Sequence, residues 1–238
     1  MTPCLFRYIA PDMSPQFINA MDLSFASALQ SRVLIIEGIS GSGKDTFQSY
    51  LKEKLEGRHV YDYSEGELLH SWKHFPIEGI LELRVKFERL FATYMRDVIK
   101  RDESAVFLLN RFHLSTYVSI AVRQPALEKE CDETLILLRT LPVHVFILEL
   151  DETEIEARSL HSERSSAWRK LQEQMITKDG FRNRLEKYVS QQRLIIDAAK
   201  RQRMPYSLIK LHSAPAQVES TLPLFSLDEE REVGGASH

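Results

Sequence analysis

The chain has 238 residues, of which 43% are hydrophobic and 27% are charged, the composition of a globular protein with one sizeable core. Its formal net charge of -3 provides no overall positive field, so no nucleic-acid partner is expected. Two cysteines are too few for a disulfide framework, and no apolar run approaches the roughly 20 residues that a membrane span needs. We therefore expect a cytoplasmic protein without a membrane partner.

Hydrophobic patterns along the chain predict strands that alternate with helices. Short apolar runs rich in β-branched residues indicate buried strands, and apolar residues at helical spacing indicate amphipathic helices. This alternation is typical of an α/β fold, with a parallel sheet and helices on both faces. In chain order we expect a strand at 33–36, a helix at 44–55, a strand at 59–63, a helix at 77–100, a strand at 105–109, helices at 113–122 and 127–139, a strand at 143–150, an irregular polar stretch at 162–180, a helix at 181–203 and a strand at 206–211.

These elements divide the chain into three parts. Residues 1–31 precede the first strand and are expected to form an N-terminal extension. Residues 32–212 carry all the predicted strands and form one domain. Residues 213–238 contain an acidic cluster and end in Gly-Gly-Ala-Ser-His, which indicates a flexible C-terminal tail.

A glycine-rich motif follows the first predicted strand. Gly38, Gly43 and Lys44 match the pattern G-x-x-x-x-G-K, in which backbone N–H groups curl around a phosphate and the lysine adds a full charge. A strand before the motif and a helix after it provide the context that such a loop requires. The motif predicts that a nucleoside triphosphate binds here, through Gly38, Ser40, Gly41, Ser42, Gly43, Lys44, Asp45 and Thr46.

The residue after Lys44 departs from the usual pattern. That position commonly carries a Ser or Thr whose hydroxyl ligates Mg²⁺, and here it is Asp45. The Asp45 carboxylate is a candidate metal ligand, either directly or through a water. Equally, it is a residue that favours the helix N-terminus through the helix dipole.

Three segments together resemble the thymidylate kinase family and, more broadly, the nucleoside and nucleoside-monophosphate kinases. Residues 36–46 are similar to the opening strand and loop of that family, and residues 110–116 are similar to its Asp-Arg-Tyr/His-x-x-Ser motif. Arg158 and Arg164 look like the arginines of its mobile lid. The resemblance implies a three-layer P-loop kinase fold with a five-stranded parallel sheet, a lid at about 158–178, ATP and Mg²⁺ as cofactors, and a small nucleotide or nucleoside acceptor.

The same resemblance implies roles for the basic residues. Lys44 would hold the donor phosphates, and Arg111 would clamp the acceptor phosphate or the transferring group with its planar fork. Arg158 and Arg164 would neutralise developing charge as the lid closes. Alternatively, Arg111 forms an ion pair at the end of a strand, and each lid arginine belongs to a solvated helix face.

Three positions depart from the family pattern. Ser40 replaces its acidic loop residue, Asn110 replaces its Asp, and Met95 stands where it has a phosphate-binding arginine, for which Arg84, Arg89 or Arg96 could substitute. The related deoxynucleoside kinases phosphorylate a neutral 5′-hydroxyl with a glutamate as base, a part that Glu37 could play. In that case Glu65 and Trp72 fall in the acceptor pocket. Otherwise Glu37 is a buried structural carboxylate.

We therefore expect phosphoryl transfer from ATP to a nucleoside monophosphate, with a thymidylate-like substrate first. The alternative within the same class is a kinase of a deoxynucleoside or another small hydroxyl compound. An alternative from another class is a catalytically weak nucleotide-binding regulatory protein, supported by Ser40, Asp45 and Asn110. A homodimer is an open possibility.

Overall fold

The structure is a computed structural model, and it describes residues 25–70, 78–159, 166–212 and 224–228. Its strands are β1 (Val33–Gly38), β2 (His59–Tyr63), β3 (Ala105–Asn110), β4 (Val143–Leu150), β5 (Tyr206–His212) and β6 (Leu224–Asp228). Its helices are α2 (Lys44–Lys54), α3 (Ile80–Arg101), α4 (His113–Arg123), α5 (Glu128–Leu138), α6 (Ile155–Ser159), α7 (Ser166–Asp179) and α8 (Phe181–Gln202).

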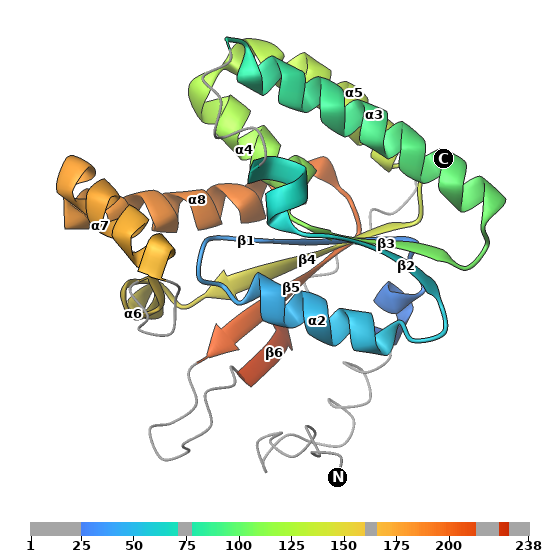
Figure 1. The fold of residues 1–238 in the computed structure, drawn as a ribbon, viewed down its shortest axis with the longest axis horizontal. Coiled ribbons are helices and arrows are strands. Elements are labelled where there is room, and N and C mark those ends of the chain that lie inside the picture. The colour runs from blue at the N-terminus through green and yellow to red at the C-terminus, as the bar shows by residue number, and fades with distance from the viewer. Residues whose placement is uncertain (1–24, 71–77, 160–165, 213–223, 229–238) are drawn as a thin grey trace, which may run out of the picture.

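The strands form one sheet in the order β2-β3-β1-β4-β5-β6 (Figure 1). Strands β1 to β5 pair in parallel, which confirms the predicted α/β fold with a five-stranded parallel sheet. The sixth strand, β6, pairs antiparallel with β5 and lies in the stretch that the sequence assigned to a flexible tail. In this order β1 is central, so the loop that follows it leaves the middle of the sheet.

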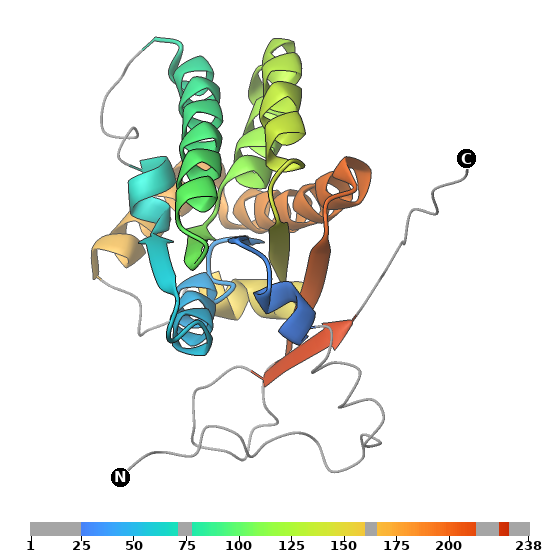
Figure 2. The ribbon, with the colours of Figure 1, turned by 90° about the vertical axis from the view of Figure 1, so that its right-hand side faces the viewer.

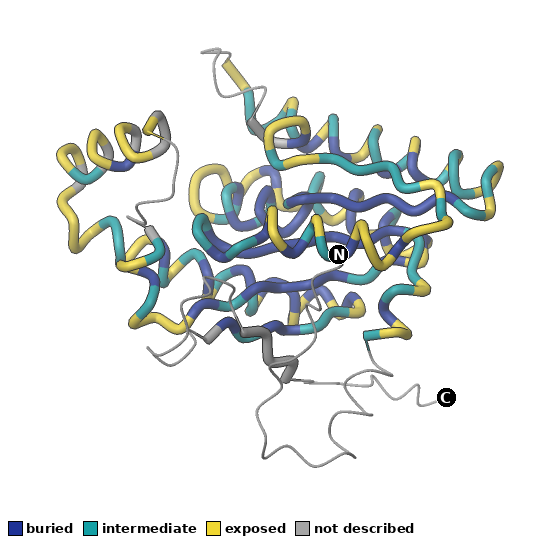
Figure 3. Tube along the Cα trace, turned by 60° about the horizontal axis from the view of Figure 1, so that its bottom comes forward, coloured by how far each residue is buried: buried dark blue, intermediate teal, exposed yellow. Residues whose placement is uncertain are grey.

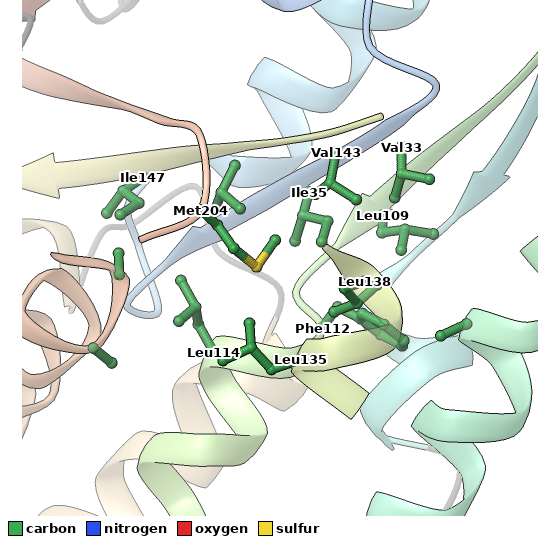
Figure 4. Packing of buried hydrophobic residues seen from close by; sticks show 14 of the residues in the cluster. Val33, Ile35, Leu109, Phe112, Leu114, Leu135, Leu138, Val143, Ile147 and Met204 are labelled. Atoms are coloured by element: carbon green, nitrogen blue, oxygen red, sulfur yellow. The ribbon is translucent and has the colours of Figure 1, made fainter. Parts of the chain in front are cut away.

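Each face of the sheet carries its own hydrophobic core, because successive residues of a strand point to opposite faces. Val33 and Ile35 of β1 belong to the cluster under α3, α4, α5 and the C-terminal half of α8 (Figures 1 and 4). Leu34 and Ile36 belong to the cluster on the α2 face, where the helical turn at 25–29 also packs. Figure 2 shows α3 and α5 side by side on one face of the sheet, with α2 on the other face. Strands β1 and β3 are buried along their whole length, as expected for a sheet covered on both sides (Figure 3).

One predicted element is wrong. The polar stretch at 162–180 was expected to be irregular, whereas α7 occupies residues 166–179 and leads directly into α8 (Figure 1). In the sequence, apolar residues recur at 167, 168, 171, 175 and 176, a helical spacing that the surrounding charged residues obscure. Among the described residues, no helix has the length and apolar character needed to cross a membrane.

Candidate active site

The phosphate loop connects β1 to α2 and depends on glycine at two positions. Gly38 has φ +151°, and a Cβ atom there would lie 2.6 Å from Ser42 Oγ and 2.8 Å from the Leu148 carbonyl oxygen. Gly41 has φ +92°, and its Cβ would lie 3.3 Å from the Arg158 carbonyl oxygen of α6. The backbone therefore approaches its neighbours too closely, and in a conformation too unfavourable, for other residues.

Lys44 begins α2 and points back into the loop. Its ammonium is buried, donates a hydrogen bond to the Ile39 carbonyl oxygen at 2.9 Å and lies 3.8 Å from Glu65 Oε2. Burial, and secondly the positive charge of Arg111, lower the pKa of Lys44 to about 7. A bound anion would offset both effects, so the loop already holds a lysine whose charge would be stabilised by phosphate.

Ser42 supports the same interpretation. Its side chain is fully buried within the loop, and no described residue forms a hydrogen bond with its Oγ. A buried hydroxyl without a partner is costly, because it has given up its hydrogen bonds to water. A phosphate oxygen in the loop could accept the missing bond.

Arg111 lies directly after β3 and faces the loop. Its φ of 64° is in the left-handed region, and its N–H donates to the Ile36 carbonyl oxygen at 2.8 Å, which ties it to β1. The guanidinium Nε lies 3.1 Å from Glu65 Oε2, and the side chain is only 12% exposed. Arg111 does form an ion pair at the end of a strand, but the pair is largely buried and shared with Lys44.

Glu65 is the residue whose importance the sequence understated. It follows β2 and brings one carboxylate oxygen between the cations of Arg111 and Lys44. The predicted neighbour Trp72 lies outside the described residues. Under the deoxynucleoside-kinase alternative the sequence placed Glu65 in the acceptor pocket, but no motif indicated that it would bridge Lys44 and Arg111.

Glu37 is fully buried at the N-terminus of α4. One carboxylate oxygen accepts hydrogen bonds from the N–H groups of Phe112 at 2.9 Å and Ser115 at 3.3 Å. The other accepts from Ser115 Oγ at 2.6 Å. A carboxylate here satisfies helix N–H groups that would otherwise be unpaired and complements the helix dipole. These contacts favour the structural interpretation of Glu37, while a catalytic role stays a prediction.

Asp45 and Asn110 are in direct contact. Asn110 Nδ2 donates to Asp45 Oδ1 at 2.7 Å and to Gln48 Oε1 at 2.8 Å, and Gln48 in turn donates to Asp62. Asp45 is exposed, whereas Asn110 is fully buried and no described residue bonds its Oδ1. An exposed carboxylate beside an orphaned amide oxygen fits Mg²⁺, which takes a few oxygen ligands from the protein and keeps several waters.

Of the two arginines predicted to belong to a lid, only one lies among the described residues. Arg158 lies at the end of α6, where its Nε is 3.2 Å from Glu154 Oε2 and its carbonyl oxygen is next to Gly41. The backbone of α6 is therefore beside the loop, while the Arg158 side chain is paired with Glu154 of the 3-10 turn that precedes α6. Arg164 lies outside the described residues. Ser40 is half-buried in the loop, and Thr46 is exposed in the first turn of α2.

A second polar cluster lies between α3 and α4. Glu88 is 2% exposed, accepts a hydrogen bond from Thr116 Oγ1 and has an oxygen 3.8 Å from Arg84 Nε. Burial raises the pKa of Glu88 to about 7 against the opposing effects of Arg84 and Thr116. The sequence missed Glu88, although an Arg and a Glu four residues apart within an otherwise apolar helix face are a usable signal.

The three candidate substitutes for the missing arginine differ in position. Met95 itself is fully buried in the hydrophobic core. Arg89 pairs with Glu133, and Arg96 with Asp97, both at exposed positions. Only Arg84 of the three points inward: burial lowers its pKa, and Glu88, Glu37, Arg111 and Glu65 all act on its charge.

A scan against protein-family models finds no match for this chain. A search among curated proteins finds no match either. Among solved structures, the chain resembles a thymidylate kinase from Ehrlichia chaffeensis at 19% identity and a TM-score of 0.43, over 79% of this chain and 91% of that one. It also resembles a deoxyadenosine kinase from M. mycoides at 14% identity and a TM-score of 0.43, over 74% and 88% of the two chains. The M. mycoides enzyme with bound dCTP gives 13% identity and a TM-score of 0.39, over 75% and 89%.

The matched structures are a nucleotide kinase and a nucleoside kinase. At such identities, and with TM-scores below 0.5, they carry no argument about function. The function has to be inferred from the geometry around Lys44, Arg111 and Glu65.

Proposed function

We propose that the chain transfers the γ-phosphoryl group of ATP to a small nucleoside or nucleotide acceptor. The proposal rests on one observation: Lys44 Nζ and Arg111 Nε lie 3.8 Å and 3.1 Å from the same oxygen of Glu65, at the mouth of the phosphate loop. Phosphoryl transfer depends on positioning and on neutralising charge rather than on covalent chemistry. Lys44 and Arg111, which converge on one oxygen of Glu65, could neutralise the charge of a phosphoryl group in transfer.

Each site residue has a role in this proposal. The loop amides and Lys44 hold the donor phosphates, and Arg111 stabilises the group in transfer. Mg²⁺ at Asp45 would neutralise charge on the β- and γ-phosphates. Arg158 and Arg164 would turn toward the nucleotide when the lid closes, which for Arg158 means leaving Glu154.

The position of Glu65 bears on the acceptor. A carboxylate 3.1 Å from Arg111 would repel a dianionic acceptor phosphate, whereas it could accept the proton of a neutral hydroxyl as that group attacks. Burial of Met95 in the core adds to this, because the family's phosphate-binding arginine has no counterpart at that position. We therefore place a nucleoside or another small hydroxyl compound ahead of a thymidylate-like monophosphate.

An acceptor screen tests the proposal. The full-length protein is incubated with ATP and Mg²⁺ and with free nucleosides, dTMP and other monophosphates, and both ADP and the phosphorylated product are measured. Lys44→Ala serves as the inactive control. We expect turnover with a nucleoside and little with any monophosphate.

Other outcomes separate the alternatives. Turnover with monophosphates alone would restore the first expectation from the sequence. ATP binding without Lys44-dependent transfer to any acceptor would favour a nucleotide-binding regulatory protein instead.

A further inference from the structure

The hydrogen bond between Asp45 and Asn110 links two departures that looked independent in the sequence. We infer that Asp45 supplies the carboxylate of the metal site from helix α2, and that Asn110 at the end of β3 positions it. In the family that the sequence resembles, the carboxylate stands at the end of the strand and the helix supplies a hydroxyl. Here the carboxylate is on α2 and the neutral side chain is on β3, so the two groups have changed places. This inference rests on the proposed use of ATP with Mg²⁺.

The position of Asp45 suits this role. It follows Lys44 in the first turn of α2, where phosphate loops present their metal-ligating hydroxyl. Its Oδ1 accepts the bond from Asn110, and no described residue donates a hydrogen bond to Oδ2. Because the side chain is exposed, Oδ2 is accessible to a hydrated cation, and a carboxylate oxygen is a ligand that Mg²⁺ prefers.

The neutrality of Asn110 follows from the same contact. Its Nδ2 lies 2.7 Å from Asp45 Oδ1, so a carboxylate at position 110 would face a like charge at hydrogen-bonding distance. The amide instead donates to both Asp45 and Gln48, which fixes the Asp45 side chain. The pair therefore keeps a single negative charge. On this interpretation the two departures are one exchange and do not represent the loss of two functional groups.

The competing interpretation is that Asp45 only stabilises the start of α2. A helix-dipole effect requires no partner on β3 and predicts no coupling between positions 45 and 110. If the two groups have changed places, moving the carboxylate back to β3 should restore the metal binding that substitution of Asp45 alone removes. The two interpretations therefore differ in the behaviour of a double variant.

The test measures Mn²⁺ binding by electron paramagnetic resonance, with a nonhydrolysable ATP analogue bound to the full-length protein. We expect Asp45→Thr to weaken Mn²⁺ binding about 10-fold or more. We expect Asp45→Thr combined with Asn110→Asp to return it to within about 3-fold of the wild type. Glu53→Gln, which removes an exposed carboxylate from the same helix, is the matched control and should change nothing.

A metal-free measurement provides a second readout. Asn110→Asp alone places two carboxylates side by side and should lower Tm by at least roughly 2–4 °C. Adding Asp45→Thr should recover most of that loss. If Asp45→Thr folds poorly, Asp45→Asn removes the charge at constant size and should show the same loss of Mn²⁺ binding.

Specific results would overturn the inference. Wild-type Mn²⁺ affinity in Asp45→Thr, or no recovery in the double variant, would show that Asp45 is not the exchanged ligand even if ATP is bound and turned over. Failure of the wild-type protein to bind the ATP analogue would instead reject the proposed function, and the inference with it.

Discussion

Glu65 Oε2 lies 3.1 Å from Arg111 Nε, in a pair that also faces the ammonium of Lys44. This carboxylate offsets the charge of both cations, and at Lys44 the charges of Asp45 and Glu37 act in the same direction. A phosphate that binds here must share Lys44 and Arg111 with the Glu65 carboxylate.

The first prediction concerns Glu65→Gln. If Glu65 accepts the proton of a hydroxyl acceptor, kcat should fall about 10²- to 10⁴-fold, the usual contribution of a general base. Affinity for ATP should hold or improve, because a repelling charge is removed. Steady-state kinetics measure the fall in kcat, and calorimetric titration measures the affinity for ATP. Glu67→Gln is the control, since the Glu67 carboxylate bonds Ser64 and should leave kcat unchanged. An unchanged kcat in Glu65→Gln would show that Glu65 is not the general base.

The second prediction follows from the pKa of Lys44, which burial lowers to about 7. A bound triphosphate should raise that pKa, because it favours the charged form. Binding at pH 8 should then take up close to one proton, and binding at pH 6 close to none. Above pH 7, affinity for ATP should fall by up to about 10-fold per pH unit.

Calorimetry in two buffers with different ionisation enthalpies measures this proton uptake directly. Lys52→Gln, at an exposed lysine on the same helix, should leave the uptake unchanged. Equal uptake at pH 6 and pH 8 would contradict the assignment to Lys44.

The third prediction concerns Glu88, whose pKa burial raises to about 7. Its pKa in the folded protein lies above the ordinary value of 4.5, so the folded protein holds this proton more tightly between pH 4.5 and about 7. Its contribution to stability is therefore full below pH 4.5 and is lost as pH rises through about 7. Relative to Glu88→Gln, the wild type should lose up to about 3 kcal/mol over this range.

Urea unfolding at pH 5 and pH 8 measures the difference between the two proteins at each pH. Only the change in this difference is predicted, because Glu88→Gln also alters the contact with Arg84. Parallel pH profiles for the two proteins would show that Glu88 is ionised throughout.

The fourth prediction uses two glycines with different surroundings. Gly38→Ala combines an unfavourable φ with contacts of 2.6 Å and 2.8 Å, and should cost about 1–3 kcal/mol and abolish ATP binding. Gly57→Ala also has a positive φ, but its Cβ meets nothing within 4 Å, so it should cost about 1 kcal/mol and leave ATP binding intact. Urea unfolding and ATP titration separate the two effects. Retained ATP binding in Gly38→Ala would mean that the loop can rearrange.

The sequence predicted the central part of the fold well, because its signals there are local and strong. Strands β1, β3 and β4 are mainly apolar runs, and the loop at Gly38–Lys44 carries its own motif. Strands β2 and β5 mix polar and apolar residues and are recognised by their place between the predicted helices. Strand β6 was missed because nothing in residues 224–228 indicates a partner strand. Helix α7 was missed because its apolar residues are scattered among charged ones.

The site was predictable only where a motif names a residue. Lys44 and Arg111 are such residues, and the structure brings both to Glu65. The bond between Asp45 and Asn110 joins residues 65 positions apart, so each looked like a separate loss until the fold placed them in contact. Contacts of this kind depend on sheet order, which a single sequence does not specify.

Strand β6 has a consequence for how this protein behaves in concentrated solution. Strand β5 would otherwise present a seven-residue edge of free N–H and C=O groups, a template on which another chain could add a strand. Antiparallel pairing with β6 occupies that edge and replaces it with one of only five residues. Strand β6 should therefore reduce self-association of the protein. A chain cut after His212 should aggregate more readily, while its phosphate loop, which follows the central strand β1, is left intact.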